Sequence, residues 1–556
     1  MQTLSQYLSD ILPGIVYTKD PLHGDFQWNG AFKLAKGRGV APRVVAEEVA
    51  ATLGTEECFS KVEVAGAGFV NLTLSDEWLA RQVVDVMSDP YVGVPQDNSR
   101  TVVVDYSSPN VAKRMHVGHL RSTVIGNAID RLNRACGHRT VGDNHLGDWG
   151  TQFGKLIVAW NQWADEDAFE ADPVAELERL YVKFNEEGDE DAARAATVAL
   201  QNGAFEETLL WQQFVDASKV EYNAVYRRLG IEFDMTRGES TYENDLDPLV
   251  DRLLTNGIAI VSNGAVVVPV GDEIPPLLIR KSDGASLYGT TDLATVDFRV
   301  KALDPDTIIY VTDMRQALHF RQVFRAARAA NLVPVEVDLV HVGFGMLRLP
   351  VTDDAEVMSS RKGNTIPLVK LLDEAHSRAR AFLDSADRLT YVATTMTEAE
   401  KESVAEAVGI SSILYADLSR DPTSDVTFEW DRVLSLEGNT APYLLYALAR
   451  CHGISRKAGV APLGKLVLTT PEERALALSI SRYPDAIVAA TDGHRPNVLA
   501  AHLYDLAGTF FKFYGVCSVI SPEGVVDGSR LGLVRATMTV LYAGFRILGL
   551  RPLERM

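Results

Sequence analysis

The chain has 556 residues, of which 46% are hydrophobic and 23% charged, a composition typical of a soluble globular protein with about three or four domains. It lacks any run of about 18 or more apolar residues, and Met1 to Ile15 lacks the basic start and apolar centre of a signal peptide, so we expect a cytoplasmic protein without a membrane span. The 54 Lys and Arg against 75 Asp and Glu give a formal net charge of −21, which excludes coating of nucleic acid by bulk electrostatics but allows a local basic face.

The first 95 residues have the pattern of a small α/β domain. Residues 24–36 and 42–54 show helical spacing of apolar side chains, and residues 61–74 read as two paired strands. We therefore expect a separate domain over residues 1–95.

A strand, a polar turn and a helix follow after residue 100. Thr101–Tyr106 is β-branched and apolar enough for a buried strand. The helix is indicated by apolar residues four apart, at Leu120, Val124, Ala128 and Leu132. His116 and His119, in the sequence His-Val-Gly-His, lie at the turn between them, where free N–H groups and the helix dipole favour phosphate. Gly118 removes the Cβ that would keep a flat base away from the backbone, so the segment predicts a nucleotide site.

The rest of the chain divides into an alternating part and a helical part. Strand and helix patterns alternate over residues 96–372, which favours a doubly wound parallel sheet, and an acidic helical insertion interrupts them at 165–245. Residues 373–556 have almost wholly helical patterns with Gly and Pro at the breaks, which predicts a C-terminal bundle.

The cysteines indicate neither a disulfide framework nor a metal site. Cys58, Cys136, Cys451 and Cys517 are widely scattered, so we expect buried free thiols. The paired histidines have no third Cys, His or carboxylate ligand at a spacing typical of metal sites, so we expect no structural metal.

Several segments together resemble one known family. The sequence at His116–His119 is similar to the HIGH motif of class I aminoacyl-tRNA synthetases, and SSPNVAK before it and NHLGDWGTQFG after it are similar to arginyl-tRNA synthetases in particular. Further similar segments are VMSSRKGNT, YADLSRDPTSDVTFEW, RPNVLAAHLYDLAGTFFKFY and the terminal RPLERM. The resemblance covers nearly the whole chain. It implies an HUP-type Rossmann catalytic core, an N-terminal domain that packs on the tRNA elbow and an α-helical anticodon-binding bundle.

The family's activity sets the expected substrates. The resemblance implies activation of L-arginine with ATP, as its Mg²⁺ complex, to arginyl-adenylate, followed by transfer to the terminal adenosine of tRNA(Arg). It also implies a monomer, with no DNA or membrane partner.

The resemblance assigns the catalytic and ATP-binding residues. His116 and His119 would stabilise charge that develops on the phosphoryl oxygens. The loop VMSSRKGNT is similar to the family's KMSKS loop, with Lys362 and Arg361 as its cations, but Val357 replaces the first lysine. Lys113 is a further candidate for the missing charge. The ATP-binding candidates are Gly118, Met358, Ser359, Ser360, His341 and Gly343.

Arginine recognition needs an anion and planar acceptors, because a guanidinium presents five donors in a fixed fork. Tyr288 and Asp292 are four residues apart and would share one helix face, and the matching residues of the family hold the guanidinium. The family's residues for the amino-acid head group correspond to Asn144 and Gln316, and Ser107 and Asn110 would shape the neighbouring wall.

Five further residues are candidates for tRNA contact. Phe69 and Asn71 match a segment that binds a D-loop base, although Phe69 could equally be a core residue. Tyr443, Tyr446 and Arg450 lie in the anticodon-binding region, where aromatic residues at helical spacing are more often core.

Two departures from the family pattern leave an alternative function open. Arg139 stands where relatives commonly carry an acidic residue, and Asp143 is a candidate to replace that acid. Together with Val357, Arg139 leaves open a catalytically altered paralogue that senses arginine or tRNA, or confers tolerance to an arginine-like inhibitor.

Overall fold

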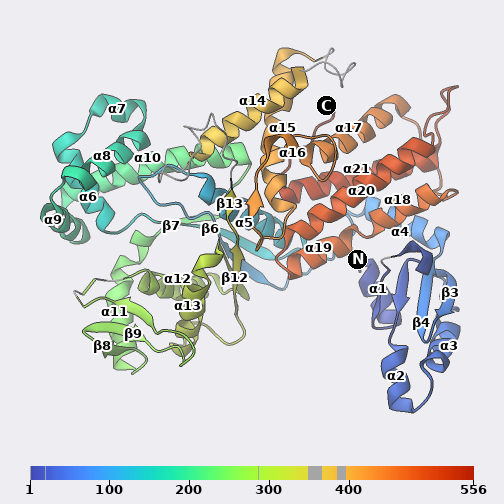
Figure 1. The fold of residues 1–556 in the computed structure, drawn as a ribbon, viewed down its shortest axis with the longest axis horizontal. Coiled ribbons are helices and arrows are strands. Elements are labelled where there is room, and N and C mark those ends of the chain that lie inside the picture. Colours follow the sequence, from blue (N-terminus) through green and yellow to red (C-terminus); the bar gives the residue numbers. More distant parts are fainter. Residues whose placement is uncertain (1, 19, 283, 286, 349–365, 385–395) are drawn as a thin grey trace.

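The computed structural model describes residues 2–18, 20–282, 284–285, 287–348, 366–384 and 396–556 (Figure 1). A central parallel sheet lies between a helical insertion at one end of the long axis and the N-terminal domain at the other, and the helical bundle packs beside it (Figure 1).

The N-terminal domain is an antiparallel sheet with helices on it. Its strands are β1 (Ile15–Tyr17), β2 (Phe26–Trp28), β3 (Phe59–Ala65) and β4 (Phe69–Leu74), in the order β1-β2-β4-β3. Its helices are α1 (Leu4–Ile11), η1 (Pro21–His23), α2 (Ala31–Arg38) and α3 (Pro42–Leu53). The helix expected from residue 24 is wrong in its first part, because alternate burial of Phe26 and Trp28 places them in a strand. Helix α4 (Asp76–Ser88) then packs on the bundle.

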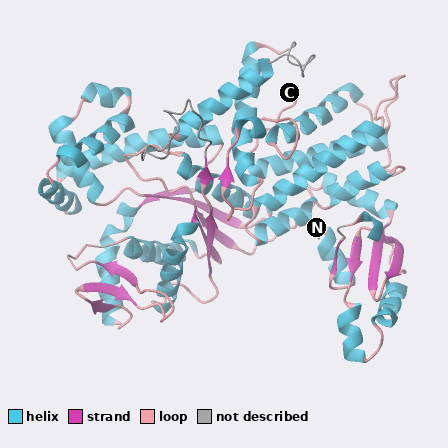
Figure 2. Cartoon of the chain, in the orientation of Figure 1, coloured by secondary structure: helices cyan, strands magenta, loops and turns pink. Residues whose placement is uncertain are grey.

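Five parallel strands form the catalytic sheet (Figure 2). They are β5 (Thr101–Asp105), β6 (Arg139–Leu146), β7 (Met235–Gly238), β11 (Thr307–Asp313) and β12 (Asp338–Phe344), in the order β12-β11-β5-β6-β7. The strand and helix predicted after residue 100 are confirmed as β5 and α5 (Val117–Ala135). Strand order reverses between β5 and β11, and ligands of doubly wound sheets bind at the carboxyl ends of strands at such a point.

Two segments are inserted between strands of this sheet. The first is helical, as predicted, and consists of α6 (Thr151–Trp163), α7 (Glu166–Ala171), α8 (Pro173–Glu187), α9 (Glu190–Gln201) and α10 (Phe205–Leu229). The predicted bounds of 165–245 are wrong, because the helices begin at Thr151 and the predicted range includes β7, a strand of the parallel sheet. The second segment has an antiparallel sheet that the sequence did not predict, made of β8 (Ile260–Ser262), β9 (Ala265–Val268) and β10 (Leu277–Arg280). It shares a hydrophobic core with η2 (Glu239–Tyr242), α11 (Glu243–Thr255), α12 (Tyr288–Leu303) and α13 (Ala317–Ala329). The short helix η3 (Met314–Gln316) directly precedes α13.

The C-terminal part is helical, as predicted. Its helices are α14 (Leu368–Asp384), α15 (Glu398–Leu418), α16 (Trp430–Val433), α17 (Ala441–Ala458), α18 (Pro471–Ser481), α19 (Tyr483–Asp492), α20 (Pro496–Val516) and α21 (Gly528–Leu548). Short strands β13 (Leu347–Arg348) and β14 (Val426–Thr427) pair in parallel and join the end of the catalytic sheet to the bundle. All four cysteines are buried free thiols, as expected.

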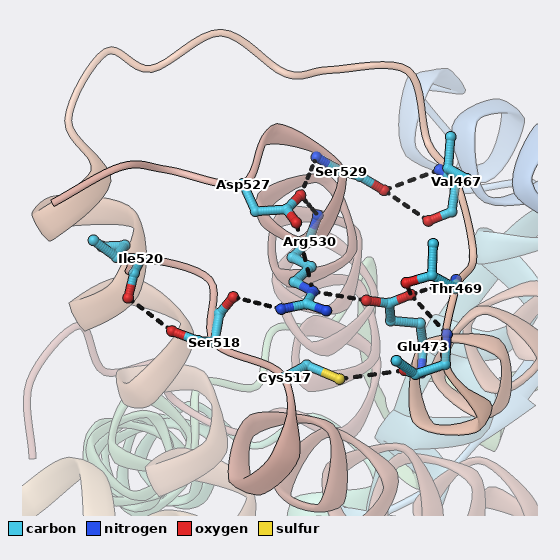
Figure 3. A network of polar contacts seen from close by, with 10 residues as sticks. Val467, Thr469, Glu473, Cys517, Ser518, Ile520, Asp527, Ser529 and Arg530 are labelled. Atoms are coloured by element: carbon cyan, nitrogen blue, oxygen red, sulfur yellow. Dashed lines mark hydrogen bonds and ion pairs between the residues drawn. The ribbon is translucent and has the colours of Figure 1, made fainter. Parts of the chain in front are cut away.

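A network of polar contacts connects the starts of α18 and α21 and the segment between α20 and α21 (Figure 3). The Arg530 guanidinium in α21 donates to Glu473 at 2.7 Å and to the carbonyl oxygen of Ser518 at 2.9 Å. The second Glu473 oxygen accepts the backbone N–H of Thr469 at 2.6 Å. The Arg530–Glu473 pair thus joins the starts of α18 and α21 to each other, and Arg530 joins them to the segment after α20. Helix α21 is long and apolar enough to cross a membrane, but 67% of its most apolar window is buried, as in a core helix.

Candidate active site

The paired histidines stand at the N-terminus of α5, where backbone N–H groups lack helical partners. His116 is the N-cap residue, and its Nδ1 accepts the backbone N–H of Gly118 at 3.0 Å. The backbone N–H of His116 donates to Nδ1 of His119 at 3.1 Å, and the ring centroids lie 4.0 Å apart. Because each Nδ1 is an acceptor, each ring carries its proton on Nε2 and offers that N–H as a donor.

Burial keeps both rings uncharged. It lowers the pKa of His119 to about 3, and His116 contributes to the same shift. The pKa of His116 is lowered first by burial and then by the Lys113 ammonium. Gly118 is needed here because a Cβ at that position would lie 2.7 Å from Cε1 of the His116 ring. The turn therefore presents two neutral donors at the positive end of a helix.

Two helices of the insertion hold the loop that leads into this turn. The Lys113 ammonium lies 5.1 Å from the ring centroid of Tyr181 in α8. The Tyr222 hydroxyl in α10 donates to the carbonyl oxygens of Asn110 and Lys113, at 2.7 and 2.8 Å. The structure thus places Lys113 within electrostatic range of His116.

A directed chain of hydrogen bonds joins Asn144 in β6 to His119. The Thr123 hydroxyl donates to the carbonyl oxygen of His119 at 2.7 Å, so its oxygen accepts from Ser107 at 2.8 Å. The Ser107 hydroxyl has then used its one hydrogen and accepts from Tyr226 at 2.8 Å. The Tyr226 oxygen accepts the Asn144 side-chain N–H at 3.2 Å. The predicted arginine-binding residues Ser107 and Asn144 are thus connected to the histidine turn. Asn144 is connected through Tyr226, which the sequence analysis missed.

The loop after β5 has an unusual backbone. Ser107, Ser108 and Ala112 have φ of 74°, 49° and 62°, which non-glycine residues rarely adopt. The backbone N–H of Ser108 donates to the Asn144 side-chain oxygen at 3.1 Å. Asn110 is exposed and forms a bridge with Gly147, where a Cβ would lie 2.1 Å from the Asn110 amide oxygen. Such backbone conformations persist only where surrounding contacts hold them, and they cluster at functional sites.

Tyr288 and Asp292 lie on one face of α12, as predicted. Tyr288 is the first residue of the helix and is 73% exposed, while Asp292, one turn later, is half-buried. Asp292 pairs with His319 of α13, a residue that the sequence analysis missed. Gln316 is exposed at the end of η3, one turn before His319. The buried Tyr310 hydroxyl lies within electrostatic range of both Asp292 and Asp105, so α12 and the end of β5 face the same space.

A second carboxyl group faces Asp292 from η2. Glu239 directly follows β7, and its pKa is raised to about 8 by burial and by the charges of Asp292 and Asp148. Asp148 already accepts the backbone N–H and the hydroxyl of Ser240, each at 2.8 Å. The site therefore gathers three carboxyl groups, which suits a cationic substrate.

A buried arginine supports the ends of β5 and β6. The Arg299 guanidinium donates to Asp105 at 2.5 Å and to Asp143 at 2.7 Å, and the side chain is fully buried. Asp105 also accepts from the Ser108 hydroxyl at 3.1 Å. Asp143 is thus held by Arg299, and the suggestion that it could replace a missing substrate-binding acid finds no support.

Arg139 lies away from the site. It is the exposed first residue of β6, paired with Thr101 at the start of β5. Asn144 lies five residues further along the strand, a distance of about 16 Å. The structure therefore gives no support to an effect of Arg139 on arginine binding, because Arg139 stands at the opposite end of the strand from Asn144.

Strand β12 carries two further predicted residues. His341 pairs with the Thr312 hydroxyl at 2.9 Å and stacks on Phe320 of α13 at 4.9 Å. Gly343 is buried, and a Cβ there would lie 2.9 Å from the Met314 side chain. The remaining loop residues lie outside the described residues: Val357, Met358, Ser359, Ser360, Arg361 and Lys362.

The candidate tRNA contacts lie in the other two domains. Phe69 is 36% exposed and packs edge-on against Phe32, whereas Asn71 is buried and accepts from Gln27 at 2.8 Å. In the bundle, the Arg450 guanidinium lies 5.2 Å from the ring centroids of both Tyr446 and Tyr514. Tyr443 and Tyr446 are half-buried against Phe511, so they have both core contacts and accessible surface.

The fold and the histidine turn together define a class I aminoacyl-tRNA synthetase core. The model of the family "tRNA synthetases class I (R), catalytic domain" matches residues 82–430. The models "Arginyl tRNA synthetase N terminal domain" and "DALR anticodon binding domain" match residues 2–74 and 444–556. The chain belongs to the arginyl-tRNA synthetase family.

Curated relatives and solved structures are similar over nearly the full length. The chain is 40% identical over 545 residues to the arginine–tRNA ligase of Fusobacterium nucleatum, covering 96% of this chain and 93% of that protein. It is 40% identical over 559 residues to that of Shewanella denitrificans, covering 97% and 94%. The arginyl-tRNA synthetase of Plasmodium falciparum superposes with a TM-score of 0.83 at 28% identity, covering 99% and 97%. That of Thermus thermophilus has a TM-score of 0.81 at 24% identity, covering 99% and 98%, and supports the fold.

Proposed function

We propose that this chain is an arginine–tRNA ligase, which joins L-arginine to tRNA(Arg) and converts ATP to AMP and pyrophosphate. The observation that carries this proposal is the full-length similarity to arginine–tRNA ligases, together with the histidine turn at the switch point of the sheet. The rival function, an altered paralogue that only senses arginine or tRNA, is not favoured by 40% identity over 96% of the chain.

In the first step, an arginine carboxylate oxygen would attack the α-phosphorus of ATP. The bond from that phosphorus to the bridging oxygen breaks, and pyrophosphate leaves with the electron pair. Negative charge grows on the phosphoryl oxygens, and the Nε2–H groups of His116 and His119 are suited to stabilise it. The Lys113 ammonium would offset further negative charge, as would the Mg²⁺ that accompanies ATP. This contribution is needed because Val357 replaces the first lysine of the loop motif.

The acidic wall between α12 and η2 is suited to the guanidinium. Asp292 would accept from the guanidinium, and the Tyr288 hydroxyl would add a further contact. Asn144, Ser107, Asn110 and Gln316 would bind or border the amino-acid head group. For the ATP-binding part of the site we propose Met358, Ser359, Ser360, His341, Gly343 and the cations Arg361 and Lys362.

In the second step, the 2′-hydroxyl of the terminal adenosine would attack the arginyl carbonyl carbon and release AMP. We assign domains to residues 1–95, 96–372 and 373–556, with tRNA contacts at Phe69, Asn71, Tyr443, Tyr446 and Arg450. A monomeric state and a cytoplasmic location are part of the same proposal.

The test is aminoacylation of total tRNA with each of the twenty amino acids, with and without ATP. We expect ATP-dependent charging by arginine alone, with one AMP released for each arginyl-tRNA. Absence of charging by folded protein that is thermally stabilised by arginine would overturn the proposal in favour of the sensor.

A further inference from the structure

The carboxylate proposed to bind the substrate guanidinium already has one partner in the protein. Nε2 of His319 in α13 lies 2.5 Å from Oδ2 of Asp292 in α12, and their side chains are 32% and 24% exposed. Within the described ranges, the other oxygen, Oδ1, has no hydrogen-bond donor. Asp292 is therefore held on one side and open on the other.

We propose that His319 is a positioning residue for arginine: as a neutral imidazole it holds Oδ2 of Asp292 and leaves Oδ1 to the guanidinium, and as an imidazolium it competes with the substrate for that carboxylate. This inference rests on the proposed function, because it concerns how the same site binds its cationic substrate.

The two protonation states of His319 have opposite effects. A neutral imidazole donates one hydrogen bond, which restrains the carboxylate but leaves its negative charge available. An imidazolium donates the same hydrogen bond and also cancels that charge, so a guanidinium gains less from approaching it. Arginine binding should therefore weaken when His319 becomes protonated.

The hydrogen bond to Asp292 raises the pKa of His319, which brings this protonation toward neutral pH. Protonation occurs as the pH falls through that raised value, so the KM for arginine should rise on the acidic side. Glu239 also loses its charge on that side, because its pKa is raised to about 8. The experiment must therefore separate His319 from Glu239.

Five other ionisable groups on the elements around α13 are paired or remain uncharged, and Arg321 of α13 is exposed to solvent. Arg315 of η3 pairs with Asp313 at 2.7 Å. His341 of β12 is kept neutral because burial lowers its pKa. The pKa values of Tyr288 and Tyr310 are raised by burial, so both stay protonated. Arg280 of β10 pairs with Asp247 at 2.7 Å and reaches Asp251 at 3.5 Å.

His319→Gln tests the proposal, because glutamine keeps an N–H donor but does not titrate. We expect its KM for arginine at pH 8 to stay within about twofold of the wild type. Between pH 8 and 6, the KM of the wild type should rise several-fold more than that of His319→Gln. The same comparison in a Glu239→Gln background removes the second titrating carboxyl group.

His319→Ala removes the donor at every pH. We expect its KM for arginine to rise about tenfold at pH 8, the usual effect of losing a hydrogen bond to a charged group, with kcat changed less than about twofold. Circular dichroism and the KM for ATP check that the variant is folded. His376→Gln is the matched control, because His376 pairs with Glu402 at 2.8 Å with the same 32% exposure on α14, outside the site.

Two outcomes would overturn the inference. One is a His319→Gln profile that matches the wild type at every pH in the Glu239→Gln background, and the other is an unchanged KM in folded His319→Ala. Failure of the wild type to charge tRNA with arginine would instead refute the proposed function.

Discussion

Arg121 and Asp417 form a buried ion pair that joins the catalytic helix to the bundle. The Arg121 guanidinium donates to Asp417 at 2.9 and 3.0 Å, and the two side chains are 1% and 2% exposed. Arg121 lies two residues after His119, and its third nitrogen donates to the carbonyl oxygens of Gly345 and Ser424, at 2.7 and 2.8 Å. One side chain therefore links α5, the segment after β12 and the loop before β14.

Removal of one charge should destabilise this junction. Asp417→Asn leaves Arg121 buried without its counter-charge, a loss of about 3 to 5 kcal/mol. We expect the midpoint of thermal unfolding to fall by about 3 to 4 °C, because a chain of this length has a large unfolding entropy. Asp191→Asn is the control, because its pair with Arg194 is exposed and should contribute almost nothing. Equal midpoints for the two variants would show that the pair is dispensable.

The histidine turn should act through its neutral donors. His119→Ala should lower kcat by about 10² to 10³, the usual loss for one donor to a developing anion, with less effect on the KM for arginine. Because the pKa of His119 is lowered to about 3, this contribution should not titrate between pH 8 and 6. The measurement is kcat against pH at saturating substrates. A kcat step near pH 6.5 that vanishes in His119→Ala would contradict this assignment.

The hydrogen-bond chain through Tyr226 should affect arginine binding. Tyr226→Phe leaves the Asn144 amide and the Ser107 hydroxyl without their shared partner, so we expect the KM for arginine to rise about five- to tenfold. Arg139→Ala is the control on the same strand as Asn144. Its KM for arginine should stay within about twofold of the wild type, because Arg139 lies at the opposite end of the strand from Asn144. A larger effect of Arg139→Ala than of Tyr226→Phe would reverse our placement of the site.

A half-buried histidine of α20, whose Nε2 is buried, should make stability depend on pH. Burial lowers the pKa of His502 to about 3, and its Nε2 has no hydrogen-bond partner in the part of the chain that the structure describes. Above pH 6.5 the folded and unfolded states both hold it neutral. As the pH falls below 6.5, the unfolded state takes up a proton that the folded state does not, so stability is lost.

His502→Leu should therefore unfold with a flatter pH dependence. We expect the slope of its unfolding free energy between pH 6 and 4 to be smaller by about 1.4 kcal/mol per pH unit, measured by urea unfolding. His376→Gln, at a more exposed position, is the control. A wild-type slope in His502→Leu would show that the ring is accessible to protons in the folded state.

Much of the fold was predictable because its signals are local. The β-branched run at Thr101 and the four-residue spacing after His116 specify a strand and a helix by themselves. The small sheet β8-β9-β10 was missed because its strands have only three or four residues, too few to show a period. The strand at Phe26 was missed because it lies directly before a helical pattern.

The sequence by itself determined the class of fold, the strand, turn and helix that carry the paired histidines, and the segments that carry motif signals, because these depend on neighbouring residues. Only the tertiary structure decided which side chains support them. Tyr226 reaches Ser107 across 119 residues, Arg299 reaches Asp105 across 194, and Asp417 reaches Arg121 across 296. It also placed Arg139 away from the histidine turn, because Arg139 begins β6 whereas Asn144 lies near its other end. Such contacts form only when helices pack on the sheet, so no spacing along the chain reveals them.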